Sequence, residues 1–438
     1  MGVDRRLESG LEKRKNPRQG AVIVWDSSAV CGIRCGRGGC DGALTVLSEG
    51  ASGVATATYA ESVGRITAAL RLIAVAAATI AAMMLGATTS SLAQCAGFCG
   101  GGGGGPPPQM SNTSASPAIA SSFAMFDLST HYLQLLGGMG GPTWQGSLFG
   151  TGPNPGGGGA PATPAPPKYR AWTELYGLAS KTGAQNDFPG DSRSSVGGVA
   201  GIAMNVAPGA MLGVSVDQSH TNIDITGLPQ GAKLDLTQFG VNGSYEMGNW
   251  TVSAAVIGGV AGVDSNRDTP SGPATANYHA SLWGAITEAA YYVPLGSARI
   301  VPKVGADWVQ THVDAYAEAG GVDAAAVPAA TSDRTRIFAG AEIGNTWVLT
   351  NTVLDLSAYA RGVDIVSQHV PSLTVTAVSG PATPVTVFGV TEAQYGLETG
   401  AGASLRLSPL ARLYLLYDGR FRDGFHSNGG TLGLEFRW

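Results

Sequence analysis

The strongest constraint on this chain is a two-residue alternation of apolar and polar side chains that recurs through residues 169–438. From Leu212 to Val216, for example, apolar residues alternate with glycine and serine, and residues 238–246 and 300–308 repeat the pattern. Successive side chains of a β-strand point to opposite faces, so each such strand has one apolar and one polar face. In lipid, strands satisfy all their backbone groups only by closing into a barrel. The alternation therefore predicts an all-β membrane protein, an antiparallel transmembrane β-barrel.

Short and long connections alternate between the predicted strands, which is a second signal. Bacterial barrels of this kind have short turns at one rim and long loops at the other. The short connections are predicted at 207–210, 248–249, 294–297, 350–351 and 408–409. The longer ones are predicted at 181–194, 220–233, 263–275, 314–333, 367–384 and 420–428. This spacing predicts about twelve strands, an even number that places both barrel ends at the rim with the short turns.

Ionised residues in the strands are expected to face the lumen, because a charge that faces lipid is costly. The residues predicted to do so are Asp217, Lys303, Asp307, Asp355, Arg361 and Asp364. Tryptophan and tyrosine fall mostly near strand ends, as at Trp250 and Tyr291, which is typical of the aromatic girdles at a membrane interface.

A secretory signal peptide is predicted at residues 64–93, before the barrel. A basic flank precedes the apolar run 72–85, and small residues end the segment. The run is shorter than the roughly 20 apolar residues that a spanning helix needs. We therefore interpret it as an export signal for the Sec translocon, with cleavage between Ala93 and Gln94. Cys95 leaves a lipoprotein open as an alternative, although Gln94 is bulky and polar for a lipobox.

Residues 1–63 mix charged residues and glycine without a period. Because signal peptides normally begin at the true start, this segment is interpreted as a mis-assigned start or a disordered extended leader. The five cysteines all lie between Cys31 and Cys99, so the barrel region has none, as suits an oxidising compartment. Their spacing lacks the second half of a zinc site, so no metal or other cofactor is predicted. The formal net charge of -5 argues against a nucleic-acid partner.

Residues 94–168 are rich in glycine and proline, a composition typical of disordered spacers. One helix is predicted within them at about 117–136, because apolar residues recur there at helical spacing and Pro117 suits a first turn. The linker that follows the helix is long enough to thread a pore. The sequence therefore leaves open whether the helix lies in the pore or outside it.

The last residues of the chain resemble the assembly signal of outer-membrane proteins. Thr431, Gly433, Phe436 and the terminal Trp438 occupy its polar, glycine, hydrophobic and aromatic positions. A strand that ends in this way offers a free edge with which an assembly machine can pair before the barrel closes.

Residues 169–438 as a whole resemble the autotransporter β-domain. The segments that carry the resemblance are 171–177, 197–201, 212–216, 245–250 and the closing strand. The resemblance implies type V secretion in a Gram-negative bacterium. It implies a barrel inserted into outer-membrane lipid by the barrel-assembly machinery, whose pore passes an N-terminal passenger to the cell surface. Two departures are that residues 94–168 are short for a passenger and that a Gly/Pro-rich linker separates the helix from the first strand.

Other functions remain as alternatives. A passenger-less porin-like or adhesin-like barrel, probed by its conductance, fits the same fold, and a soluble β-sandwich is a further alternative fold. A barrel enzyme is weighed on Gly190-Asp191-Ser192, which begins like an esterase motif, and on Asp217 with His220, which resembles an acid and base near the outer rim. No nucleophile stands at a matching spacing, so the prediction is a monomeric barrel without enzyme activity.

Overall fold

The computed structural model describes residues 113–137 and 168–438, except residues 271, 322, 350–351, 379–382 and 409. The predicted signal peptide, its cleavage between Ala93 and Gln94, the leader 1–63 and every cysteine lie outside the described residues.

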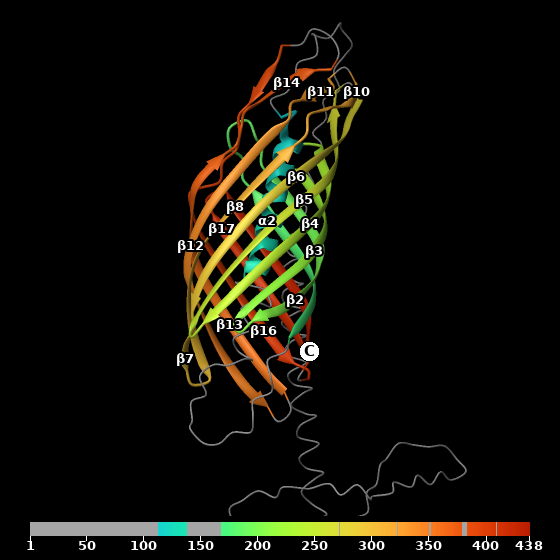
Figure 1. Ribbon diagram of the computed structural model, residues 1–438. Helices are drawn as coiled ribbons and strands as arrows, with labels where there is room; N and C mark the ends of the chain where they lie inside the picture. The colour runs from blue at the N-terminus through green and yellow to red at the C-terminus, as the bar shows by residue number, and fades with distance from the viewer. Residues whose placement is uncertain are drawn as a thin grey trace, which may run out of the picture. The chain divides into compact units, whose positions relative to one another are not determined.

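Twelve long antiparallel strands form a closed barrel (Figure 1). In chain order they are β1 (Tyr169–Thr182), β2 (Asp191–Ala207), β3 (Ala210–Ile225), β4 (Gln230–Met247), β5 (Trp250–Thr269), β6 (Gly272–Tyr291), β8 (Ala298–Val313), β12 (Ala330–Leu349), β13 (Thr352–His369), β16 (Tyr395–Arg406), β17 (Ala411–Arg422) and β18 (Phe425–Arg437). Each pairs with the next, and β18 pairs with β1 along the full length of both, which closes the ring. The predicted fold class is confirmed.

Short connections gather at one rim of the barrel, here called the turn rim. The hairpins β2–β3 and β4–β5 turn there through Gly209 (φ 76°) and Gly248 (φ 61°), left-handed conformations that glycine adopts without strain. The two ends of the barrel meet at the same rim, where Tyr169 and Trp438 exchange two backbone hydrogen bonds of 2.8 and 3.0 Å. The opposite end, here called the loop rim, has the longest connections, those between β8 and β12 and between β13 and β16. The long connections predicted at 220–233, 263–275 and 420–428 are instead turns of two to four residues, because the strands on either side extend further than predicted.

The loop rim carries short additional strands. They are β9 (Tyr316–Ala317), β10 (Ala319–Gly320), β11 (Ala325–Val327), β14 (Leu373–Ala377) and β15 (Val385–Val387). Four of them form a separate small sheet in the order β15-β14-β11-β9, while β10 adds to β6. A further short strand, β7 (Val293–Leu295), pairs with β8 at the turn rim. Figure 1 shows β11 and β14 beyond the long strands, at the end opposite the C-terminus.

The outer wall is apolar, as the sequence predicts. Leu175, Phe239 and Val260 expose 67%, 63% and 63% of their surface, although they lie in the middle of regular strands. Large exposed apolar residues of this kind mark a surface that contacts lipid. Among the described residues, none of the helical segments has both the length and the apolar character needed to cross a membrane.

The prediction that Asp364 faces the lumen is wrong. Arg361 on the same strand is buried inside the barrel, and side chains of a strand alternate between faces. Three residues further along, Asp364 therefore lies on the outer face, between the buried Val363 and Ile365. Its Oδ1 accepts a hydrogen bond of 3.0 Å from the exposed Gln394 near the loop rim, where water replaces lipid.

Candidate functional site: a helix in the barrel lumen

The lumen is occupied by the helix α2 (Ser116–Gly137), within which the predicted helix 117–136 lies. All its residues are buried except Ser122, which is half-buried. Its sequence is apolar or neutral on every side, and Asp127 is its only carboxylate. A helix of this kind is stable only when it is enclosed. The structure therefore answers the question that the sequence left open, since α2 lies in the pore (Figure 1).

One side of α2 packs against the barrel strands β3 to β6. This part of the barrel wall, here called the glycine wall, accommodates bulky helix residues at positions where its strands carry glycine. A Cβ atom at Gly240 would lie 2.4 Å from Cδ1 of Leu136, and one at Gly284 would lie 3.0 Å from Cδ1 of Leu133. Contacts closer than about 3.5 Å between carbon atoms are repulsive. These glycines therefore let the helix approach the strand backbone.

The glycine wall also makes two hydroxyl contacts with α2. The hydroxyls of Tyr132 and Ser215 share a hydrogen bond of 2.6 Å, and those of Ser121 and Tyr278 share one of 3.3 Å. At the last residue of the helix, Ser253 Oγ donates to the carbonyl of Gly137. That bond satisfies one of the carbonyls that a helix C-terminus leaves without a partner.

The opposite side of α2 faces three arginines from three distant strands, here called the arginine wall. Arg193 of β2 forms an ion pair of 3.0 Å with Asp127. Arg334 of β12 donates a hydrogen bond of 2.8 Å to Thr130 Oγ1. Arg420 of β17 completes the wall. Its two Nη atoms donate to the backbone carbonyl of Asp127 at 3.3 Å and to the Gln134 side chain at 3.2 Å. The helix thus meets a charged partner along two turns.

A second layer of paired charges lies beside these arginines. Arg336 pairs with Asp307 at 2.6 Å and with Glu398 at 2.9 Å, and Gln134 donates to Glu398 at 3.3 Å. Arg361 also pairs with Glu398. Buried charges are tolerated only when they are paired and hydrogen-bonded. Gln134 therefore connects α2 to a set of charges that neutralise one another.

Glu392 enters this network from the connection between β15 and β16. It pairs with Arg334 and, at 2.5 Å, with Arg422. Burial by itself raises the pKa of the Glu392 carboxyl. The positive charges of Arg334, Arg422, Arg336 and Arg193 outweigh that effect and lower the pKa to about 2. The loop is thus tied into the mouth of the lumen by an ionised carboxylate.

The direction in which α2 runs through the lumen follows from the contacts at its two ends. Near the start of α2, Gln230 at the loop-rim end of β4 donates a hydrogen bond of 3.3 Å to Thr113. The ring centroids of Phe123 and of Phe188 in the β1–β2 loop lie 6.4 Å apart. The last residue of α2, Gly137, meets Ser253 near the turn-rim end of β5. The chain therefore enters α2 at the loop rim and leaves it in the half of the lumen nearer the turn rim.

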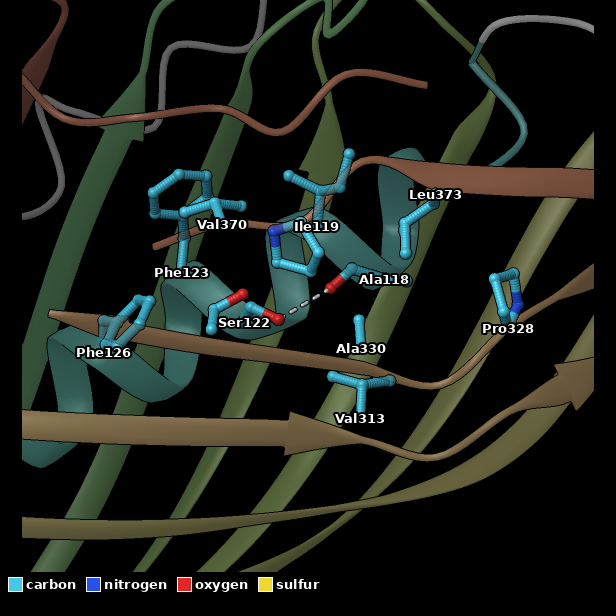
Figure 2. A pocket seen from close by; sticks show the side chains of 12 residues that line it. Ala118, Ile119, Ser122, Phe123, Phe126, Val313, Pro328, Ala330, Val370 and Leu373 are labelled. Carbon is cyan, nitrogen blue, oxygen red and sulfur yellow. Dashed lines mark hydrogen bonds between the residues drawn. The ribbon is translucent and has the colours of Figure 1, made fainter. Parts of the chain in front are cut away.

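A small cleft remains beside the first turns of α2 at the loop rim. Figure 2 shows Ala118, Ser122 and Phe126 on the helix side of it, opposite Val313, Ala330 and Leu373. Its cavity volume is about 20 Å³. Sites for small molecules are usually about 300–1,000 Å³, so the cleft is a packing gap between helix and wall.

The remaining residues predicted to face the lumen lie inside the barrel. Asp217 accepts hydrogen bonds from Tyr176 at 2.9 Å and from Gln238 at 2.8 Å. Lys303 pairs with Glu342 at 3.1 Å, and Asp355 pairs with Arg299 at 2.7 Å. Asp307 and Arg361 belong to the layer of paired charges beside the arginine wall.

The four residues of the predicted assembly signal lie on or after β18. Phe436 and Trp438 face outward, 46% and 57% exposed, and the Trp438 ring lies 5.9 Å from that of Tyr169. Thr431 is buried, and a Cβ atom at Gly433 would clash with the ring of Tyr414. The signal thus spans the seam at which the barrel closes.

The candidate enzyme residues are not brought together. Asp217 points into the lumen, whereas His220, three residues along the same strand, faces outward and pairs with Asp235 at 2.7 Å. In the predicted esterase motif, Asp191 is buried against Arg193 at 2.8 Å, while Ser192 faces outward. Within the described ranges, no group of three or more metal-binding side chains is found.

The residues that hold α2 were not among those predicted. Arg334 and Arg336, two apart on one strand, were readable as an inward pair from the strand period. Arg193 and Arg420 were hidden because they lie in segments predicted as connections, 181–194 and 420–428, which the structure shows to be partly strand. For Glu392 no local signal exists, since it lies in a connection and enters the lumen only in the folded chain.

Comparison with known proteins gives a consistent result. The family model described as the autotransporter beta-domain matches residues 171–418. Among solved structures, the chain is similar to the translocator domain of autotransporter NalP from Neisseria meningitidis, at 14% identity and a TM-score of 0.56. The match covers 74% of this chain and 100% of that one.

The β-domain of the Bordetella autotransporter BrkA is also similar, at 15% identity and a TM-score of 0.46. That match covers 62% of this chain and 100% of that one. At 14% identity, the similarity to the NalP translocator domain indicates a shared fold and nothing finer. A comparison with curated proteins gave no match.

Proposed function

Because the chain belongs to the autotransporter β-domain family, we propose that it exports its own short N-terminal segment and keeps the end of that segment in the lumen as α2. The barrel is an outer-membrane translocator domain. Residues 94–112 would then be presented at the cell surface, and residues 138–167 would connect the lumen to β1 on the periplasmic side.

The observation that carries the proposal is the direction in which the buried helix runs through the lumen. The chain enters α2 at the loop rim, beside Gln230 and Phe188, and leaves it toward the turn rim. In bacterial barrels the long loops face the exterior and the short turns face the periplasm. The proposal therefore places the segment that precedes α2 in the sequence on the exterior side.

The fit between helix and lumen supports retention after export. The helix meets the arginine wall through Asp127, Thr130 and Gln134, and it meets the glycine wall through Leu133 and Leu136. A segment that only passes through the pore during export needs no such matched contacts. These contacts favour one position along the pore, so that α2 both anchors the exported residues and closes the lumen.

A porin-like role is the second candidate. A lumen lined by many charged side chains would conduct ions if it were empty, since twelve strands leave a pore wider than small barrels do. The buried helix argues against a permanently open channel. An adhesin-like role of the barrel itself remains compatible with the proposal, because it concerns the exterior loops.

Assembly is proposed to follow the route general in this family. The barrel-assembly machinery would recognise Thr431, Gly433, Phe436 and Trp438 on the closing strand after export through the Sec translocon. One chain closes the barrel by pairing β1 with β18, which suits a monomer in the membrane. Translocator domains of this family are usually not enzymes, and we propose none here.

Surface proteolysis tests the proposal. A protease recognition site replaces the glycine run at 101–105 in one variant and the glycine run at 156–159 in a matched control. In intact cells, we expect cleavage at the first site only, and cleavage at the second only after the outer membrane is permeabilised. Protection of the first site, or cleavage of the second in intact cells, contradicts the proposed path of the chain.

A further inference from the structure

One polar side chain of α2 is not matched by the arginine wall. Thr130, His131 and Gln134 follow Asp127 by three, four and seven residues, so the four side chains lie on one face of the helix. The arginine wall supplies a partner to Asp127, Thr130 and Gln134. Nε2 of His131 is buried and has no hydrogen-bond partner among the residues that the structure describes. His131 is therefore the exception in the fit between helix and lumen.

The side chains next to His131 come from β1 and β17. The ring centroids of His131 and Tyr176 lie 4.5 Å apart, and the Tyr176 hydroxyl donates its hydrogen bond to Asp217. Arg420 donates to the backbone carbonyl of Asp127, which is the carbonyl that accepts the backbone N–H of His131 in an α-helix. A fixed positive charge thus lies beside the same turn of α2 as the His131 ring.

The carboxylates on the surrounding elements do not serve His131. They already have partners, namely Asp127 with Arg193, Asp191 with Arg193, Asp217 with Tyr176 and Gln238, Glu174 with Tyr414, Asp418 with Tyr359, and Glu398 with Arg336 and Arg361. Among these residues, none accepts a hydrogen bond from Nε2 of His131. A proton added to the ring would therefore be a buried charge without a counter-ion.

The lumen accepts a neutral His131 far better than a protonated one. Burial of an unpaired charge is costly, and here the positive charge of Arg420 adds repulsion. His131 is only 1% exposed while α2 is in the lumen, whereas release of the helix would transfer the ring to water. In water, histidine takes up a proton with a pKa of about 6.5.

We propose that His131 makes the retention of α2 sensitive to pH, so that acid releases the helix from the lumen and opens the barrel. Proton linkage gives the direction of the effect. The released helix binds a proton that the enclosed helix excludes, so retention is strongest above about pH 6.5 and weakens as the pH falls below that value. The inference rests on closure of the lumen by α2, which is part of the proposed function, and it is independent of export.

Single-channel recording of the full chain at pH 7.5 and at pH 5.5 tests the proposal. The open fraction should rise about tenfold at the lower pH, because a group with a pKa of about 6.5 that is protonated only after release shifts the equilibrium by that factor. His131→Phe keeps a ring beside Tyr176 and removes the titrating group, so the rise should disappear. His131→Gln, which is neutral and polar, should behave in the same way.

The matched control is His279→Phe, which replaces an exposed histidine on the outer face of β6 and should keep the tenfold rise. Heat-dependent mobility on gels shows that each variant has folded. A rise that persists in both H131F and H131Q, or an unaltered chain that stays closed at both pH values, overturns the pH switch and leaves the helical plug in place. High conductance of the unaltered chain at both pH values overturns the plug and the switch together.

Discussion

The two walls that hold α2 achieve the same end by different physics. The glycine wall accepts Leu133 and Leu136 by shape, with glycine backbones in close contact with apolar side chains. The arginine wall holds Asp127, Thr130 and Gln134 by charge and hydrogen bonds from three strands that are far apart in the sequence. The glycine wall excludes helix side chains that are too large, and the arginine wall requires particular polar side chains on the helix.

The difference predicts unequal sensitivity to mutation. Overpacking a close apolar contact typically costs about 1–3 kcal/mol, because neighbours shift to relieve it. Leaving a buried charge without its partner costs about 3–5 kcal/mol, because no shift restores the lost hydration. The arginine wall should therefore dominate how firmly the helix is retained, while the glycine wall should set how deeply it fits.

Removing the helix abolishes its contacts with both walls at once and has the largest expected effect. Deletion of residues 113–137 should convert a closed barrel into a conducting pore, since α2 fills the lumen. Single-channel recording in planar bilayers measures the change, and the heat-dependent mobility of folded barrels on gels serves as the folding control. A folded deletion variant that stays closed would remove the support for a helical plug, and high conductance of the unaltered chain would favour the porin-like alternative.

Arg193→Met tests the arginine wall. It leaves both Asp127 and Asp191 buried without their ion-pair partner, and the loss at Asp127 should weaken retention of α2 by about 3–5 kcal/mol and raise the open fraction of the channel accordingly. The triple variant Arg193→Met/Asp127→Leu/Asp191→Asn removes all three charges and should recover most of the loss. If the triple variant is no better than the single one, charge pairing is not what retains the helix.

Gly240→Ala tests the glycine wall. The new Cβ atom would lie 2.4 Å from Leu136 Cδ1, and we expect a loss of about 1–3 kcal/mol in helix retention. Adding Leu136→Ala should relieve the clash. As a control, Gly262→Ala meets no atom within 4 Å on the neighbouring β5 and should leave the recordings unchanged. An effect of Gly262→Ala equal to that of Gly240→Ala would argue against a specific fit.

Tyr132→Phe has the smallest expected effect. It removes the 2.6 Å hydrogen bond with Ser215 while keeping the ring, which typically costs about 0.5–1.5 kcal/mol. The open fraction should rise by about tenfold or less, since 1.4 kcal/mol corresponds to a factor of ten. A larger rise than that of Arg193→Met would invert the proposed ranking of the two walls.

The sequence predicts the barrel well because its main signal is local. A strand in a membrane must alternate at every second residue, so segments such as 212–216 and the short turns near Gly209 and Gly248 can be located one at a time. The same period, applied consistently, would have placed Asp364 outside once Arg361 was placed inside. It would also have marked Arg334 and Arg336 as an inward pair.

The sequence by itself determined the strands, their number, the apolar outer wall and the presence of one helix, since each depends on neighbours along the chain. Only the tertiary structure decided what the helix meets. Closing the ring brings Arg193, Arg334 and Arg420 from β2, β12 and β17 to one side of α2, and it turns Glu392 from a connection into the lumen. Pairing across a lumen joins residues that are hundreds of positions apart, and no periodicity in the chain records which of them will face each other.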